Sequence, residues 1–517
     1  MARGKSYKVS FKPTFQNQVM LFPPDLNEMV SADHPVRIVD QIIDGIDLRV
    51  LVARYKAGGT SSYSPSMLLK VLVYAYMNNI YSSRKIEDVL KRDIYFMWLS
   101  GMSKPDHNTI SRFRSNRLQE ILQPIFSQVV LLLCTEGLLS LKELYTDGTK
   151  IEANANRYSF VWGKSITNNR EKIKEQLNEL WRYAQSVAAA ELNSPPDPPD
   201  PGPVDSSKVR EAIEQINQAL DSVKNEKKVD PKIRQKLNYA HKNWPDTLDK
   251  YDKQEQILNG RNSYSKTDTD ATFMRMKEDH MKNGQLKPAY NVQISTNNQY
   301  ILSYSIHQNP GDTLTLPTHL SSHIKHLKIK PSNITADAGY GSEQNYKLLE
   351  SKKITAYVKH NQFDRNQNEK IRLKKRFTVD QLPYDQQEDA FTCPAGKKLI
   401  NQGSFQSQSG SGYPQVITKY QCESCSYCRL KSQCHGQKGN RVIEVNLQYR
   451  RLKTKADKRL NTKKGIAKRK KRCYDVEPVF ANIKHNHQFK RFMLRGLEKV
   501  TVEMGLLALA HNLRKVA

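Results

Sequence analysis

Apolar residues recur at helical spacing through the first part of the chain. The segment VRIVDQIIDGI, which follows Pro35, carries apolar residues three and four positions apart and predicts an amphipathic helix. Ser64 and Pro65 precede SMLLKVLVYAYM, and this pair is typical of a helix start because serine caps free N–H groups and proline fits the first turn. Ser82–Leu90 begins with a similar cap. We therefore expect a series of short helices here.

Strand patterns appear farther along the chain. Residues Tyr290–Ile294 and Tyr300–Ile306 alternate between apolar and polar side chains around Asn297-Asn298, which predicts a β-hairpin. A shorter apolar stretch, Leu144–Thr146, predicts an earlier strand. After the hairpin, helical and strand-like segments alternate: Leu316–Leu327, Asn333–Asp337, Glu343–Ser351 and Ile354–Lys359. This order predicts the α/β class, with a mixed sheet flanked by helices.

Two long segments interrupt this order. Residues 161–259 contain charged helical patterns, Asn168–Leu192 and Ser206–Asn243, on either side of the stretch NSPPDPPDPGPVDS. Proline at that density gives a stiff, extended linker, so we expect a helical hairpin inserted after the first strand. Residues 363–440 are polar and are expected to be irregular.

The charge of the chain indicates its kind of partner. The 517 residues include 82 Lys and Arg against 52 Asp and Glu, a formal net charge of +30. Such an excess favours a polyanion, most commonly nucleic acid. The basic residues are spread along the chain and are densest in Arg450–Arg472, so a membrane surface is not expected. No secretory signal is visible, and the longest apolar stretch, Val129–Cys134, is too short to cross a bilayer.

One N-terminal segment, PDHNTISRFRSNR, combines a helix start with positive charge. Asn108 or Thr109 can cap a helix there, next to the apolar Ile110 and Phe113. The helix would carry three arginines: Arg112, Arg114 and Arg117. Short helices ending in a basic one are what a helix-turn-helix DNA-binding module looks like. A plain helical bundle with a solvated basic face explains the same residues equally well.

Three acidic residues stand where chemistry is expected. Asp147 follows Leu144–Thr146 and precedes a glycine, which indicates either a hairpin turn or a carboxylate on a central strand. Asp337 follows a second short apolar stretch in the same way. Carboxylates side by side in one sheet are suitable ligands for Mg²⁺ or Mn²⁺. For a third acid, Glu477 and Glu503 compete; Glu477 directly precedes a proline at a helix start, where the helix dipole favours an anion.

Five of the seven cysteines lie between Cys393 and Cys434, where a disulfide framework is not indicated and a reducing compartment is expected. The spacing Cys422-x₂-Cys425-x₂-Cys428-x₅-Cys434 is typical of zinc ligands. Five cysteines compete for four positions. The favoured set is Cys393, Cys425, Cys428 and Cys434, and the alternative is a group of reduced thiols without metal.

Taken together, Asp147 in YTDGTKIEANAN, Asp337 in TADAGY, and Glu477 with Lys484 seven residues later resemble the DDE transposases of bacterial insertion sequences. That family carries Tyr, Arg, Glu and Lys at set offsets. Here Arg472 lies five residues before Glu477, one more than the commonest spacing. The resemblance implies an RNase H-like core, and cleavage and strand transfer of DNA by Asp147, Asp337 and Glu477 with two Mg²⁺ or Mn²⁺ ions.

The residues and the resemblance together imply partners and a domain plan. The expected DNA contacts are Lys484, Arg491, Arg472 and the three arginines of the N-terminal helix, acting on double-stranded DNA with terminal inverted repeats and on target DNA. A homodimer or higher oligomer in a synaptic complex, and a bacterial cytoplasmic, nucleoid-associated location, are expected. The plan comprises a helical domain (1–140), core segments (141–160 and 260–360), the hairpin insertion (161–259), a cysteine-rich insertion (361–449) and basic and catalytic helices (450–517).

Two other functions are compatible with the same residues. One is a sequence-specific DNA-binding protein that has kept the fold and lost catalysis. The other is a nuclease that cuts DNA without joining it. The presence of all three acids favours the enzyme over the binding protein.

Overall fold

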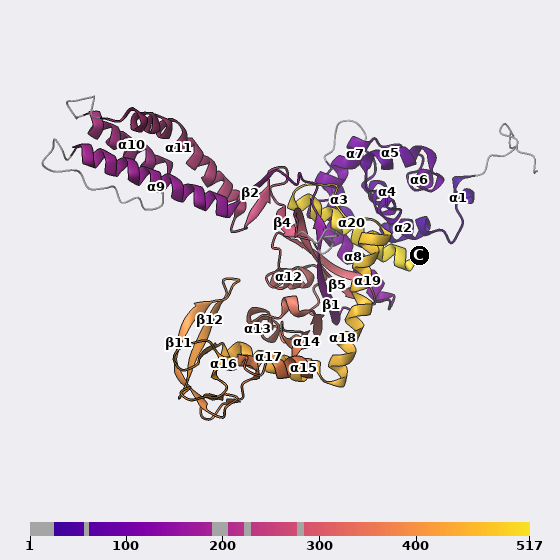
Figure 1. The fold of residues 1–517 in the computed structure, drawn as a ribbon. Coiled ribbons are helices and arrows are strands. Elements are labelled where there is room, and N and C mark those ends of the chain that lie inside the picture. The colour runs from indigo at the N-terminus through magenta and orange to yellow at the C-terminus, as the bar shows by residue number, and fades with distance from the viewer. Residues whose placement is uncertain (1–24, 56–61, 189–204, 222–228, 277–283) are drawn as a thin grey trace, which may run out of the picture.

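The computed structural model describes residues 25–55, 62–188, 205–221, 229–276 and 284–517 (Figure 1). Its centre is a six-stranded sheet in the order β4-β5-β1-β7-β8, with β6 paired to β5. The strands are β1 (Glu143–Glu152), β4 (Thr272–Arg275), β5 (Leu286–Asn297), β6 (Tyr300–His307), β7 (Asn333–Ala336) and β8 (Thr355–Val358). Strand β1 is antiparallel to β5 and parallel to β7, so the predicted mixed α/β sheet is confirmed.

Strand β1 runs through Asp147 and Gly148 without turning, and Asp147 pairs with Ile294 of β5. The hairpin interpretation of Asp-Gly is therefore wrong, and Asp147 stands on a central strand. The predicted β5–β6 hairpin is present. Its turn residues are Asn298 and Gln299, both at positive φ, one position later than expected.

The N-terminal helices and the last helix pack together in one hydrophobic core. The last helix, α20 (Leu497–Val516), packs against β6, α4 (Pro65–Met77) and α8 (Leu122–Thr135), and α12 (Leu316–Leu327) packs against β6 and α8. Ser64 caps α4, and Pro65 lies in its first turn, as expected. The remaining N-terminal helices are α1 (Leu26–Met29), α2 (Pro35–Asp44), α3 (Arg49–Val52), α5 (Ser83–Arg92), α6 (Ile94–Leu99), α7 (His107–Arg112) and a π-helix (Phe113–Arg117).

Helix α7 is capped by Asp106, which accepts the backbone N–H of Thr109, and not by Asn108 or Thr109. Within the described ranges no single helix is long and apolar enough to cross a membrane, although the bent pair His107–Arg117 and Leu122–Thr135 passes that test by length and composition.

The first insertion is an arm that projects from the sheet (Figure 1). It leaves and returns through the antiparallel strands β2 (Phe160–Trp162) and β3 (Ser263–Ser265). Its described residues form three helices, α9 (Gly163–Ala188), α10 (Ser206–Asp221) and α11 (Pro231–Leu258), with a hydrophobic core of their own. The predicted two-helix hairpin is therefore wrong, because Asp230 caps a new helix that begins at Pro231. Most of the proline-rich stretch lies outside the described residues.

The second insertion is ordered, contrary to expectation. Five antiparallel strands form a sheet in the order β13-β12-β11-β10-β9. They are β9 (Tyr384–Asp385), β10 (Ala390–Thr392), β11 (Lys398–Gln408), β12 (Pro414–Cys422) and β13 (Val442–Val445), with α14 (Phe363–Gln367), α15 (Glu369–Lys374) and α16 (Lys431–Cys434) around them. Most residues of β11 are exposed, so the strand lacks the apolar alternation that reveals a half-buried sheet.

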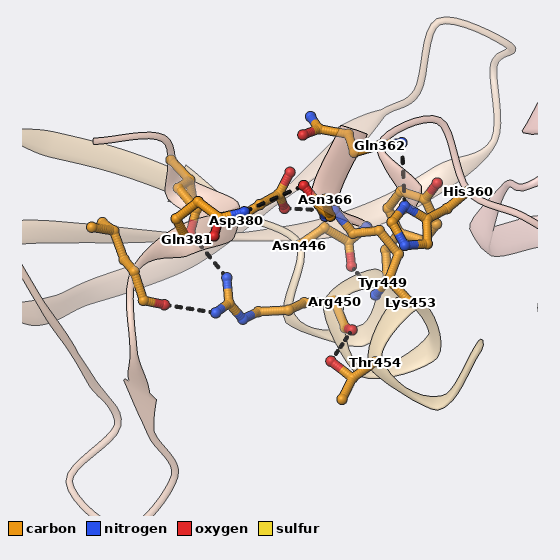
Figure 2. Close-up of polar contacts among 12 residues, drawn as sticks. His360, Gln362, Asn366, Asp380, Gln381, Asn446, Tyr449, Arg450, Lys453 and Thr454 are labelled. Carbon is orange, nitrogen blue, oxygen red and sulfur yellow. Dashed lines mark hydrogen bonds and ion pairs between the residues drawn. The ribbon is translucent and has the colours of Figure 1, made fainter. Parts of the chain in front are cut away.

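The basic run 450–472 is helical and partly used for internal contacts. It forms most of α17 (Leu447–Leu460) and α18 (Lys463–Asp475). Arg450 donates to the carbonyl oxygens of Val379 and Leu382 at 3.0 and 2.7 Å, and Lys453 pairs with Asp380 at 2.7 Å (Figure 2). These contacts dock α17 on the second insertion. After α18 come α19 (Glu477–Ala481) and a π-helix (Asn482–Asn486).

Candidate active site

Asp147 and Glu477 are brought to one guanidinium group. Arg472, near the end of α18, lies 3.5 Å from Asp147 Oδ2 and 3.1 Å from Glu477 Oε1. Asp147 is 9% exposed, and Glu477 is about half exposed at the start of α19, directly before a proline. The expected placement of Glu477 at a helix start is confirmed. Two carboxylates more than 300 residues apart in sequence thus share one cation.

Asp337 lies one residue beyond the end of β7, the parallel neighbour of β1. Tyr145 of β1 pairs with Thr335 of β7, so the two aspartates occupy equivalent positions two residues farther along. Adjacent strands are about 5 Å apart, and residues two apart share a face of the sheet. Asp337 Oδ1 accepts the N–H of Gly339 at 2.8 Å, which fixes the carboxylate on the turn that follows β7.

The electrostatics of Tyr340 support this grouping. Its side chain is fully buried, and its pKa is raised well above its ordinary value by burial first and then by the carboxylates of Asp312, Asp147 and Asp337. The guanidinium of Arg472 acts in the opposite direction. Two candidate aspartates, Arg472 and a further carboxylate, Asp312, therefore surround one phenol. No sequence signal marks Asp312, because its loop follows β6 without a recognisable motif.

Asp475 is a second residue that the sequence did not reveal. Its carboxylate is 2% exposed and accepts from the Thr296 hydroxyl at 2.7 Å and from the N–H groups of Asn298 and Gln299 at 2.9 and 3.2 Å. The end of α18 is thereby fixed to the β5–β6 turn. Because Glu477 follows two residues later, this contact sets the position of the third acid.

Glu503 has a different environment from the other acids. It is 0% exposed and accepts from the N–H of Leu494 at 3.0 Å, from the N–H of Met493, and from the hydroxyl of Tyr76 at 3.3 Å. Burial raises its pKa, while the nearby Arg114 acts to lower it. This carboxylate joins α20 to the N-terminal helices, and its contacts are those of a core residue.

Several expected DNA contacts do not face outward. Arg114 is 4% exposed and donates to the Tyr76 hydroxyl at 3.1 Å and to the carbonyl of Tyr81, so its expected role on DNA is corrected to a core contact. Lys484 is 6% exposed. Arg112 and Arg117 of the same N-terminal segment are exposed, and Arg117 lies over the ring of Tyr55.

The seven-residue spacing of Glu477, Lys484 and Arg491 predicts that the three side chains share one face of a continuous helix. The helical region ends at Asn486, and Gln488 at positive φ turns the chain. The backbone of Arg491 forms an isolated parallel β-bridge with Glu152, and its guanidinium donates to the carbonyl oxygen of Ala153 at 3.1 Å. The expected common face is therefore wrong, and Arg491 joins the end of β1.

The three acids are the right kind of ligand for a hard divalent cation, but their side chains are not arranged around a metal position. Among the described residues, no group of three or more His, Cys, Asp or Glu side chains is placed so that it could hold a metal ion. Arg472 provides a stand-in positive charge that Asp147 and Glu477 both reach. Carboxylate oxygens are the ligands that Mg²⁺ prefers, so the donor set fits the ion.

The cysteines of the second insertion converge on one cavity. Its lining includes Cys393, Cys422, Cys425, Cys428 and Cys434, together with His435 and Arg441. The backbone N–H of Arg441 donates to Cys425 Sγ at 3.3 Å, and its guanidinium donates to Cys434 Sγ at 3.1 Å. His435 Nε2 is buried and has no hydrogen-bond partner. Burial raises the pKa of Cys422 to about 12.

Comparison with known proteins identifies the class. Residues 392–517 match the family described as "Transposase DDE domain", and residues 24–116 match "Transposase domain (DUF772)". No curated protein and no solved structure matches the chain. Both matches support a DDE transposase of insertion-sequence type. The first match contains Glu477 and all five clustered cysteines, whereas Asp147 and Asp337 lie between the matched regions.

Proposed function

We propose that this transposase cuts DNA at the ends of an insertion sequence and joins those ends to target DNA by metal-dependent phosphoryl transfer. Asp147, Asp337 and Glu477 are the catalytic residues of this proposal. The observation that carries it is the shared contact of Arg472 with Asp147 and Glu477, with Asp337 directly after the neighbouring parallel strand β7.

The three carboxylates would hold two Mg²⁺ or Mn²⁺ ions, which activate the attacking hydroxyl and stabilise the leaving oxygen. The protein supplies the geometry: β1 carries Asp147, the turn after β7 carries Asp337, and Asp475 fixes the end of α18 beside Glu477. Arg472 neutralises two of the acids while no other cation is there. Three carboxylates crowded without a cation would repel and raise one another's pKa.

Exposed cations near the site are suited to the DNA backbone. Helices α17 and α18 lead directly to Glu477, and their exposed basic residues include Arg451, Lys458, Lys463, Lys464 and Lys470. Lysine and arginine contacts to phosphates fix the register of DNA without reading its sequence. In this proposal a homodimer or higher oligomer pairs the two DNA ends.

The test measures nicking and strand transfer on DNA that carries the element's ends, in Mg²⁺. Asp147→Asn, Asp337→Asn and Glu477→Gln should each abolish both products and retain gel-shift binding, because phosphate contacts come from other residues. Asp364→Asn, at an exposed aspartate that pairs with Lys359, is the matched control and should cut normally. Cleavage by all three acid variants would refute the proposal. Binding by the wild type with no cleavage would favour a DNA-binding protein, and nicking without joined products would favour a nuclease.

We also propose that the cysteine cavity binds a structural zinc ion. Cys393, Cys425, Cys428 and Cys434 are the expected ligands, and four thiolate ligands are typical of such sites. Two observations support the proposal: the cysteines line one cavity, and the buried Nε2 of His435 beside them has no partner. A zinc ion would stabilise an insertion with a small hydrophobic core.

A further inference from the structure

A buried side-chain amide lies directly against the strand that carries Asp147. Gln293 of β5 is opposite Gly148 in the sheet, and its side chain is 0% exposed. A Cβ atom at Gly148 would collide with Gln293 Nε2 and would come within 2.7 Å of Asp312 Oδ1. Because Gly148 has no side chain, Gln293 and Asp312 can occupy the space beside it.

Gln293 is the centre of a closed hydrogen-bond network, which we name the Gln293 hub: Asn291, Gln293, Asp312 and Tyr340. Gln293 Nε2 donates to Asn291 Oδ1 and to Asp312 Oδ1, both at 2.9 Å. Asn291 Nδ2 donates to Asp312 Oδ1 at 2.8 Å. Gln293 Oε1 accepts from the hydroxyl of Tyr340. Both functional atoms of the buried amide thus have hydrogen-bond partners, and Asp312 is the partly exposed member of the network.

The hub reaches the turn that carries Asp337. Tyr340 is three residues beyond Asp337, and the Thr313 hydroxyl donates to the carbonyl of Gly339 at 2.9 Å. Asn345 Nδ2 donates to the carbonyl oxygens of Thr313 and Tyr340, each at 2.9 Å. The loop containing Asp312 is therefore joined to the Asp337 turn on one side and to β5 on the other.

We propose that the Gln293 hub positions the two catalytic aspartates relative to each other, with Gln293 and Tyr340 as its positioning residues. It fixes the Asp337 turn against the segment of β1 that follows Asp147. The proposal rests on the proposed function, because it takes these two aspartates as metal-holding. Hydrogen-bond partners behind metal ligands orient them, and their loss typically lowers metal affinity or activity by about 10- to 100-fold.

Two physical arguments support a positioning role. A buried polar network that is fully satisfied specifies one arrangement, because any other leaves groups without partners in a medium of low dielectric. The phenol of Tyr340 also stays protonated, since burial and neighbouring carboxylates hold its pKa well above the ordinary value. It therefore donates to Gln293 at every pH at which cleavage is measured.

The experiment uses the full chain with two variants. Tyr340→Phe removes only the hydroxyl. Gln293→Glu keeps an oxygen for Tyr340 but places a second carboxylate against Asp312. Tyr304→Phe is the matched control, because Tyr304 is also buried in the sheet and lies outside the hub, with its hydroxyl near Gly505. Three quantities are measured: Mn²⁺ affinity of the DNA-free protein by calorimetry, the Mg²⁺ concentration for half-maximal cleavage, and the melting temperature.

Tyr340→Phe and Gln293→Glu should weaken Mn²⁺ binding and raise the half-maximal Mg²⁺ concentration by about tenfold or more, with unchanged DNA binding. Tyr304→Phe should alter neither. Wild-type Mn²⁺ affinity and Mg²⁺ dependence in both hub variants, while Asp147→Asn and Asp337→Asn are inactive, would overturn the hub proposal alone. A fall in melting temperature with unchanged metal dependence would also overturn it. Cleavage by the aspartate variants would instead refute the proposed function.

Discussion

Replacing the buried Glu503 should lower the stability of the fold without affecting DNA cleavage. Glu503→Ala removes the acceptor for two backbone N–H groups and the Tyr76 hydroxyl in a site that is 0% exposed. Each buried donor left without a partner costs about 1–3 kcal/mol. It also leaves Arg114, which is 4% exposed, without the nearby negative charge. Removing one partner of a buried charge pair costs about 3–5 kcal/mol.

We therefore expect Glu503→Ala to lower the free energy of unfolding by at least about 3 kcal/mol, a large share of a typical total of about 5–15 kcal/mol. Glu503→Gln, which keeps one oxygen acceptor, should lose less. Glu498→Ala, an exposed glutamate in the first turn of the same helix, should change it by less than about 0.5 kcal/mol.

The assay combines denaturant unfolding with DNA nicking at a temperature at which the variant is folded. Glu503→Ala should cut DNA at the wild-type rate per folded molecule, whereas Glu477→Ala should melt normally and fail to cut. A Glu503→Ala protein as stable as the wild type would refute the energetic reasoning. A folded Glu503→Ala protein that cannot cut, alongside an active Glu477→Ala protein, would show that the third acid is wrongly assigned.

Three further predictions concern charge, zinc and pH. DNA affinity should fall steeply with salt, and replacing both Lys463 and Lys464 by alanine should reduce the slope of log affinity against log salt by about 2; affinity independent of salt would contradict nucleic-acid binding. Purified protein should hold about one zinc per chain, lost with a lower melting temperature when Cys425 and Cys428 become serine; metal-free protein that melts like the wild type would contradict the zinc site. Burial lowers the pKa of His323 to about 4, so the stability that the neutral imidazole gives above its ordinary pKa of 6.5 should be lost as the pH falls from 6.5 to 4. In unfolding titrations, His323→Gln should reduce that loss by up to about 3 kcal/mol. An unchanged pH dependence would contradict this.

Local rules predicted the features that depend on a few neighbouring residues. The cap at Ser64, the β5–β6 hairpin and the helix start at Glu477 follow from turn, cap and proline chemistry. Asp147 was ambiguous, because Asp-Gly is common both in turns and at sites. Its pairing with β5, far away in the sequence, decided the matter.

Features that depend on distant contacts were not predictable in this way. The sequence predicts Arg114 on a basic face. In the structure its guanidinium donates to the hydroxyl of Tyr76, a buried residue of another helix. Arg472 was predicted to contact DNA, and its position between Asp147 and Glu477 became clear only from the fold. In the second insertion, most residues of the longest strand, β11, are exposed, so apolar alternation does not reveal that strand.

The positions of the three acids also explain how the chain tolerates such large insertions. The arm of 161–259 leaves through the paired strands β2 and β3, and the second insertion follows β8, so neither interrupts β1, β5 or β7. Glu477 lies beyond both insertions, yet its place is set by Asp475 on the β5–β6 turn, a contact made entirely within the core. Either insertion could therefore change in size without moving an acid, provided that α18 still ends at that turn.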